Sequence, residues 1–135
     1  MPSEYFNKSF YDSVKSIFSS LNARNIQTKY QLAYPAPTIN NFSKVNICRI
    51  LQEIVANIIK HSDASNVQVK IYYNTNLTIQ IIDDGLGFEM EERKGGIGLL
   101  NIESRVNGMN GKIEIETTKG NGTHILFKIP LKVLK

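Results

Sequence analysis

Residues 77–87 read Leu-Thr-Ile-Gln-Ile-Ile-Asp-Asp-Gly-Leu-Gly, and this stretch decides the fold. Apolar side chains alternate from Leu77 to Ile81, which predicts a strand with one buried face. By the same count in twos, Asp83 falls on that buried face. A buried carboxylate must find hydrogen-bond donors, because leaving it unpaired costs several kcal/mol. Two hypotheses follow: Asp83 accepts from a ligand such as the exocyclic amine of a purine, or it caps the following turn.

Outward from this strand, the hydrophobic periodicity predicts three helices and four further strands. The expected elements are a helix over 6–21, a strand over 26–34, a helix over 44–61 with Ser43 as N-cap, strands from 67 and 77, a helix over 99–108, and strands over 112–117 and 123–129. Because strict strand–helix alternation is absent, a doubly wound sheet is not expected. We expect an α+β fold, a two-layer α/β sandwich whose mixed sheet of about five strands is covered on one face by three helices.

Length and composition fit one folded domain over residues 1–135. The chain is 41% hydrophobic, too much for a disordered tail. Its single cysteine, Cys48, excludes an internal disulfide and a cysteine metal cluster, and is expected to be a buried core thiol. No stretch approaches the roughly 18 apolar residues of a membrane span, and no signal peptide precedes the first helix. We therefore expect a cytoplasmic domain.

The charge balance is mildly basic, with 16 basic and 12 acidic residues and a net charge of +4. The basic residues are scattered, without a dense run or interleaved aromatic residues, so nucleic acid is not an expected partner. A basic pocket for a small phosphorylated ligand is equally compatible with this charge.

The second predicted helix carries four polar side chains at helical spacing. Glu53 and Asn57 are four residues apart, and Lys60 and His61 follow three and four residues after Asn57. Such spacings place side chains on one face of an α-helix. This face could hold a phosphate chain and its metal, since an amide oxygen ligates Mg²⁺ and an ammonium group neutralises phosphate. A solvated helix face with incidental pairing is the alternative.

Two glycine clusters follow the buried strand. Gly85 and Gly87 form the first, and Gly96 and Gly98 belong to the second, which leads directly into a helix. Glycine permits positive φ and close approach of backbone to a ligand. Free N–H groups at a helix start could receive phosphate oxygens. The polar residues 89–94 between the clusters predict a short lid, and neither a dinucleotide fingerprint nor a P-loop is present.

Thr123 lies on the apolar face of the last predicted strand, in step with Ile125 and Phe127. A buried hydroxyl group needs a partner. Asp83 or a ligand could supply one, and the alternative explanation is an ordinary cross-strand threonine in the sheet.

Taken together, these motifs resemble the ATP-binding catalytic domain of sensor histidine kinases, which has the Bergerat fold shared with gyrase, MutL and a heat-shock chaperone. The resemblance covers about residues 10–131. Its motifs are the N box at 51–62, the G1 box at 83–88, the G2 box at 96–99 followed by Arg105-Val106, and the closing Gly-x-Gly-Thr at 120–123.

The resemblance implies that the chain binds ATP and Mg²⁺. Asn57 would ligate Mg²⁺, Glu53 would act as or position the general base, and Lys60 would be the second catalytic group. Lys60 and His61 would contact phosphates, whereas Asp83 would accept the adenine amine with Thr123 assisting through a water. The residues implied to shape the rest of the pocket are Gly85, Gly87, Gly96, Gly98 and Leu99.

Further expectations concern the parts of the protein outside this chain. Neither His61 nor His124 lies in a context that resembles a phosphoacceptor, so the chain is expected to be a fragment of a longer, homodimeric sensor. An upstream dimerisation domain would supply the phosphoacceptor histidine, and a response regulator receiver domain would take the phosphate. The Lys60-His61 pair and the short lid resemble the branch of nitrate and membrane-fluidity sensors. Family analogy also allows membrane anchoring of the full-length protein.

Three other functions remain open. One is a free-standing serine protein kinase of the anti-sigma type, and another is a non-catalytic nucleotide-sensing module. An ATPase clamp like gyrase or MutL is the weakest alternative, because those chains continue into a transducer domain.

Overall fold

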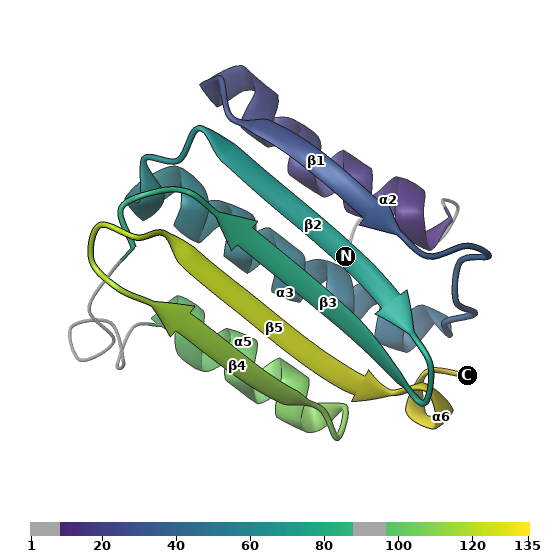
Figure 1. Ribbon diagram of the computed structural model, residues 1–135. Helices are drawn as coiled ribbons and strands as arrows, with labels where there is room; N and C mark the ends of the chain where they lie inside the picture. Colours follow the sequence, from purple (N-terminus) through teal and green to yellow (C-terminus); the bar gives the residue numbers. More distant parts are fainter. Residues whose placement is uncertain (1–8, 88–96) are drawn as a thin grey trace.

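The computed structural model describes residues 9–87 and 97–135. Five strands form one sheet in the order β1-β2-β3-β5-β4. β1 pairs with β2 in parallel, and the remaining neighbours are antiparallel. The helices α2, α3 and α5 lie on the same side of this sheet (Figure 1). The expected two-layer α+β fold with a mixed five-stranded sheet is confirmed.

The bounds of the elements place strands and helices close to where periodicity predicted them. In chain order they are α2 Phe10–Phe18, the 3-10 helix η1 Ser19–Arg24, β1 Gln27–Leu32, α3 Asn41–Asn57, the π-helix η2 Ile58–Ser62, β2 Asn66–Tyr73, β3 Asn76–Asp83, α5 Ile97–Gly108, β4 Lys112–Thr117, β5 Thr123–Pro130 and α6 Leu131–Leu134. A fourth α-helix, the short α6, was not expected.

The core lies between the helices and the inner face of the sheet. Alternation in β3 buries Leu77, Ile79 and Ile81 against α3 and α5, while Phe127 on β5 is completely buried beside them. Each fully buried side chain of this size contributes roughly 1.5–3 kcal/mol relative to exposure. Cys48 on α3 is completely buried, which confirms its assignment to the core.

Two local predictions about α3 are wrong. Ser43 is not the N-cap: the Asn40 side chain accepts a hydrogen bond from the Ser43 N–H at 2.8 Å, and the helix begins at Asn41. The predicted α-helix also does not continue to His61, because residues 58–62 form a π-helical turn. In such a turn the hydrogen bonds run from i to i+5, so side chains no longer repeat every 3.6 residues.

Candidate functional site

A polar row crosses three strands at one end of the sheet. Asp83 on β3 pairs in register with Thr123 on β5, and Thr123 pairs with Thr117 on β4. Asp83 and Thr123 are both 7% exposed and face the helices, as predicted from their parity. The Thr117 and Thr123 hydroxyl oxygens lie 3.0 Å apart, so Thr123 has a cross-strand partner, and that partner, Thr117, was not predicted.

The Asp83 carboxylate is buried and partly satisfied by the backbone. Its Oδ1 accepts the Gly85 N–H at 2.9 Å, so Asp83 does cap the following turn. Burial raises the pKa of Asp83 above 3.8, and the neighbouring Asp84 carboxylate raises it further. Hydrogen bonds from the backbone N–H groups of Gly85 and Thr123 act in the opposite direction. A carboxylate has about four acceptor positions, so this turn cap leaves acceptor capacity for a ligand donor.

Asp84 is the opposite case, an exposed carboxylate with a structural role. Its Oδ1 accepts the Ser65 and Asn66 N–H groups at 2.8 and 2.9 Å, and its Oδ2 accepts from the Asn66 side-chain amide at 2.9 Å. The Asn66 side chain is the main cause that lowers the pKa of Asp84. Asp84 thereby clamps the start of β2 to the end of β3 and holds Asp83 in place.

Gly85 and Gly87 are required by backbone packing around this row. A Cβ on Gly85 would lie 2.1 Å from the Ser62 carbonyl oxygen, at the end of the π-helical turn. Gly87 has a φ of +66°, and a Cβ there would lie 2.2 Å from the Thr118 carbonyl oxygen. The two glycines therefore let the turn after β3 approach both the helix end and the β4–β5 connection, which brings those three segments together.

The end of α3 presents the predicted polar residues beside this turn. Glu53 and Asn57 are half-buried, whereas Lys60 and His61 are exposed. The Leu86 N–H donates to the Ser62 carbonyl, which joins this helix end to the glycine turn. Because residues 58–62 are π-helical, Lys60 and His61 do not occupy the α-helical positions that predicted one common face with Asn57.

The second glycine cluster is only partly described. Gly96 lies outside the described residues, as does the predicted lid over 89–94. The backbone of Gly98 lies in the first turn of α5, where N–H groups lack intrahelical partners. Leu99 is buried. Farther along α5, Arg105 donates to the Asn46 side-chain oxygen at 3.3 Å and connects α5 to α3.

Two residues that contribute to this site had no role assigned to them from the sequence. Asp84 was part of a quoted motif without a role, and Thr117 was only the end of a predicted strand. Parity supplied a usable signal for Thr117, because it shares a face with Ile113 and Ile115. Nothing in the local pattern of Asp84 indicated its partners, which lie 18 and 19 residues away in the chain.

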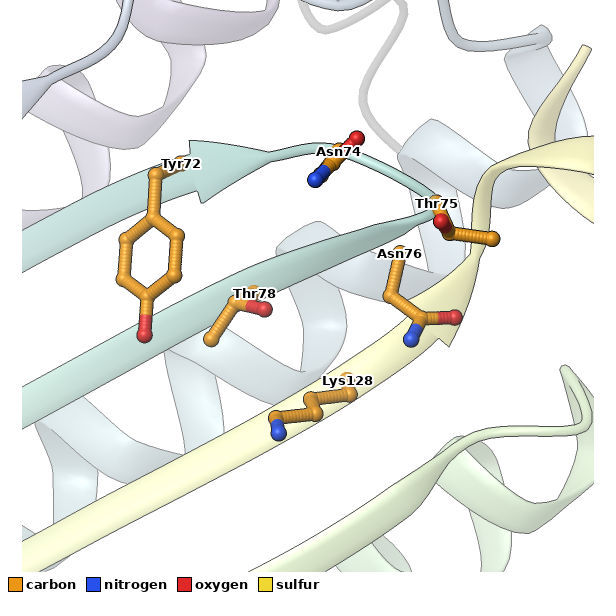
Figure 2. Close-up of a pocket in the computed structure, with 6 residues that line it drawn as sticks. All are labelled: Tyr72, Asn74, Thr75, Asn76, Thr78 and Lys128. Atoms are coloured by element: carbon orange, nitrogen blue, oxygen red, sulfur yellow. The ribbon is translucent and has the colours of Figure 1, made fainter.

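A hollow of about 210 Å³ lies at the opposite end of β3 from Asp83, on the face of the sheet away from the helices. Figure 2 shows Tyr72, Thr78 and Lys128, which come from three neighbouring strands. Asn74, Thr75 and Asn76 complete its lining. Because Thr78 and Asp83 are five residues apart on an extended strand, this hollow is separate from the Asp83 row.

Comparisons with known proteins agree with this arrangement. Residues 43–133 match the family of histidine kinase-, DNA gyrase B- and HSP90-like ATPases. The chain is 39% identical over 90 residues to the signal transduction histidine-protein kinase/phosphatase DegS of Brevibacillus brevis, covering 65% of this chain and 23% of that protein. It is 37% identical over 95 residues to the sensor histidine kinase ComP of Bacillus subtilis, covering 67% of this chain and 12% of ComP.

Solved structures show the same fold. The histidine kinase domain of the blue-light activated histidine kinase of Erythrobacter litoralis EL346 aligns with a TM-score of 0.76 at 18% identity, covering 91% of this chain and 59% of that one.

The family match and the mixed five-stranded sheet together define an ATPase domain of the α+β class. The chain belongs to the histidine kinase-, DNA gyrase B- and HSP90-like ATPase family, because the family match spans most of its length. It spans less than a quarter of the DegS and ComP relatives described above. Over residues 9–87 and 97–135, no helix combines the length and apolarity needed to cross a bilayer.

Proposed function

We propose that this chain is the catalytic domain of a sensor histidine kinase, which binds Mg-ATP and transfers its γ-phosphoryl group to a histidine on a separate dimerisation domain. The observation that carries the proposal is the buried Asp83 carboxylate at the junction of the sheet, the end of α3 and the glycine turn. The relatives named histidine kinases support the reaction, since they share up to 39% of the aligned residues.

In this proposal Asp83 accepts a hydrogen bond from the exocyclic amine of adenine. Its carboxylate is buried and desolvation raises its pKa, while the N–H groups of Gly85 and Thr123 use only part of its acceptor capacity. Thr123 stands next to it in register and contributes a hydroxyl oxygen. Gly85 and Gly87 shape the wall, and Leu99 with the α5 start at Gly98 and the undescribed Gly96 complete the pocket.

The phosphates and Mg²⁺ would lie toward the end of α3. Among the residues that the structure describes, no three His, Cys, Asp or Glu side chains gather as a metal site. Mg²⁺ commonly binds one or two protein oxygens together with substrate phosphates. The half-buried Asn57 amide fits that role, with Lys60 neutralising phosphate charge and His61 contacting the phosphates. Glu53, one turn earlier on α3, would be the general base of the transfer or would position it.

The expected partners follow from the same proposal. The phosphoacceptor domain, the response regulator receiver domain and the homodimeric state belong to a longer protein, as does any membrane anchor. We assign the chain to the nitrate and membrane-fluidity sensor branch on its Lys60-His61 pair.

Calorimetric titration of ATP, with and without Mg²⁺, tests the binding half of the proposal. Asp83→Asn should weaken ATP binding roughly 10- to 100-fold, because a hydrogen bond to a charged acceptor is lost. Asp63→Asn is a matched control: it removes the same charge from an exposed residue whose left-handed φ of 51° suits asparagine. Equal ATP affinity of wild type and Asp83→Asn would refute the adenine assignment.

Glu53→Gln tests the transfer half. In a protein that carries both this domain and the phosphoacceptor domain, the variant should bind ATP normally and transfer phosphate at least about tenfold more slowly, since base assistance contributes a factor of about 100 or more. Radiolabel from γ-phosphate appearing on histidine measures the rate. An unchanged rate would remove Glu53 from the chemistry.

A further inference from the structure

We propose that Thr117 is a positioning residue that turns the Thr123 hydroxyl so that only its acceptor lone pairs face the site beside Asp83. The site then prefers a purine with an amino group at position 6 over one with an oxo group. This inference rests on the proposed function, because it assumes that ATP binds at the Asp83 row.

The three residues form a continuous row across the sheet. Asp83, Thr123 and Thr117 are register partners on β3, β5 and β4, and adjacent strands are about 4.8 Å apart. Thr117 thus lies one strand beyond Thr123, on the side away from Asp83. A hydrogen bond between the two threonines therefore directs the Thr123 proton away from Asp83.

The direction of that hydrogen bond follows from counting protons. A threonine hydroxyl has one proton. Thr117 Oγ1 donates its proton to the Gly122 carbonyl oxygen at 3.2 Å, and a carbonyl oxygen can only accept. Either oxygen could be the donor in the 3.0 Å contact between Thr117 and Thr123, and we take Thr123 as the donor because the Thr117 proton is used on Gly122. Its own proton is used there, and its oxygen can offer only lone pairs elsewhere.

As a consequence, the side of the site formed by Asp83 and Thr123 presents only hydrogen-bond acceptors. An ionised Asp83 carboxylate presents oxygen lone pairs, and Thr123 beside it presents the same. Adenine carries an exocyclic amine with two N–H donors at position 6, which complements this edge directly or through a water. Hypoxanthine carries a carbonyl oxygen at that position, and two facing acceptors without a proton between them repel each other.

A purely structural role for Thr117 makes a different prediction. The bond to the Gly122 carbonyl also braces the connection between β4 and β5. Loss of bracing alone would disturb the pocket for every purine nucleotide, and so would change all affinities by a similar factor. The ratio of affinities for amino and oxo purines separates the two roles.

The experiment measures the Kd of ATP and of inosine triphosphate, which differs in the base at position 6, for the 135-residue chain and its variants. Thr117→Val removes the hydroxyl with little change in shape and frees the Thr123 proton to point into the site. We expect ATP binding to weaken about 3- to 10-fold, as for a lost neutral hydrogen bond, with inosine triphosphate binding unchanged or tighter. The preference for ATP should fall by at least that factor.

Two further variants complete the design. Thr117→Ser keeps the hydroxyl and should restore the wild-type ratio. Thr28→Val is the matched control: Thr28 lies in the same row of the sheet, separated from Asp83 by Val67, and its buried hydroxyl has no hydrogen-bond partner among residues 9–87 and 97–135. It should leave both affinities unchanged. If Thr117→Val does not fold, Thr117→Cys, whose thiol is a weak donor, replaces it.

An equal change for both nucleotides in Thr117→Val, or failure of Thr117→Ser to restore the ratio, would overturn the positioning role and leave the proposed function intact. A wild-type chain that binds neither nucleotide would overturn the proposed function itself, and this inference with it.

Discussion

Asp83 and Asp84 are neighbours whose carboxylates have opposite electrostatic surroundings. Asp83 is buried, and desolvation raises its pKa, whereas the hydrogen bonds from Asn66 and Ser65 lower the pKa of Asp84. For Asp83, whose pKa is higher in the folded state than the unfolded value of 3.8, the stabilising contribution is fully present below pH 3.8 and is lost as the pH rises through the folded-state pKa. For Asp84, whose pKa is lower in the folded state than 3.8, the stabilising contribution is present above pH 3.8 and is lost as the pH falls through the folded-state pKa. At neutral pH, Asp83 therefore costs stability and Asp84 provides it.

Substituting these two residues should change stability in opposite directions at pH 7. Asp83→Asn should raise the free energy of unfolding while weakening ATP binding, the usual trade-off at a functional site. Asp84→Asn should lower it by about 1 kcal/mol through weakened hydrogen bonds. Urea unfolding at pH 7 and pH 3 measures both, and both differences should shrink at pH 3. A loss of stability in Asp83→Asn at pH 7 would contradict the burial argument.

At the scale of elements, α3 connects the site to the far end of the domain. The π-helix η2, which directly follows α3, meets the glycine turn at Ser62. Its start is held by Asn40, whose N–H donates to the Leu134 carbonyl at 2.6 Å and whose side chain caps the helix. The Asn40 amide also donates to the Val133 carbonyl at 3.4 Å, so one residue ties α3 to α6.

Asn40→Ala should lower the free energy of unfolding by about 1–2 kcal/mol, since it removes an N-cap and the contacts to α6. Ser43→Ala, which the sequence pattern would have marked as the cap substitution, should cost about half as much or less. Thermal unfolding of the two variants side by side measures the difference. Equal losses would mean that Ser43 shares the capping role.

At the scale of the whole molecule, ATP binding should stabilise the folded state, and a residue of the single hydrophobic core can report that effect. Cys48 lies in that core with its side chain completely buried. Burial raises the pKa of its thiol to about 11, although Lys44 opposes the shift. Because the thiolate is the reactive form, Cys48 reports on unfolding of the molecule as a whole.

Native Cys48 should react with a thiol reagent only through unfolding, and ATP should slow that reaction. At a free ATP concentration ten times the Kd, the open population and the labelling rate should both fall about tenfold. Asp83→Asn should show no such protection. Fast labelling that ATP does not affect would mean that Cys48 is reached by a local opening separate from the site.

The sequence by itself determined the strands, the main helices and the inward positions of Asp83 and Thr123, because side-chain alternation and helical spacing are local properties of the chain. The order β1-β2-β3-β5-β4, the π-helical turn, the Asp84 hydrogen bonds to β2 and the contact between the Thr117 and Thr123 hydroxyl groups were decided by tertiary structure. Each of these depends on groups that meet only after folding. Gly85, for instance, is recognisable as flexible in the sequence, but only the approach of the Ser62 carbonyl oxygen explains why no side chain fits there.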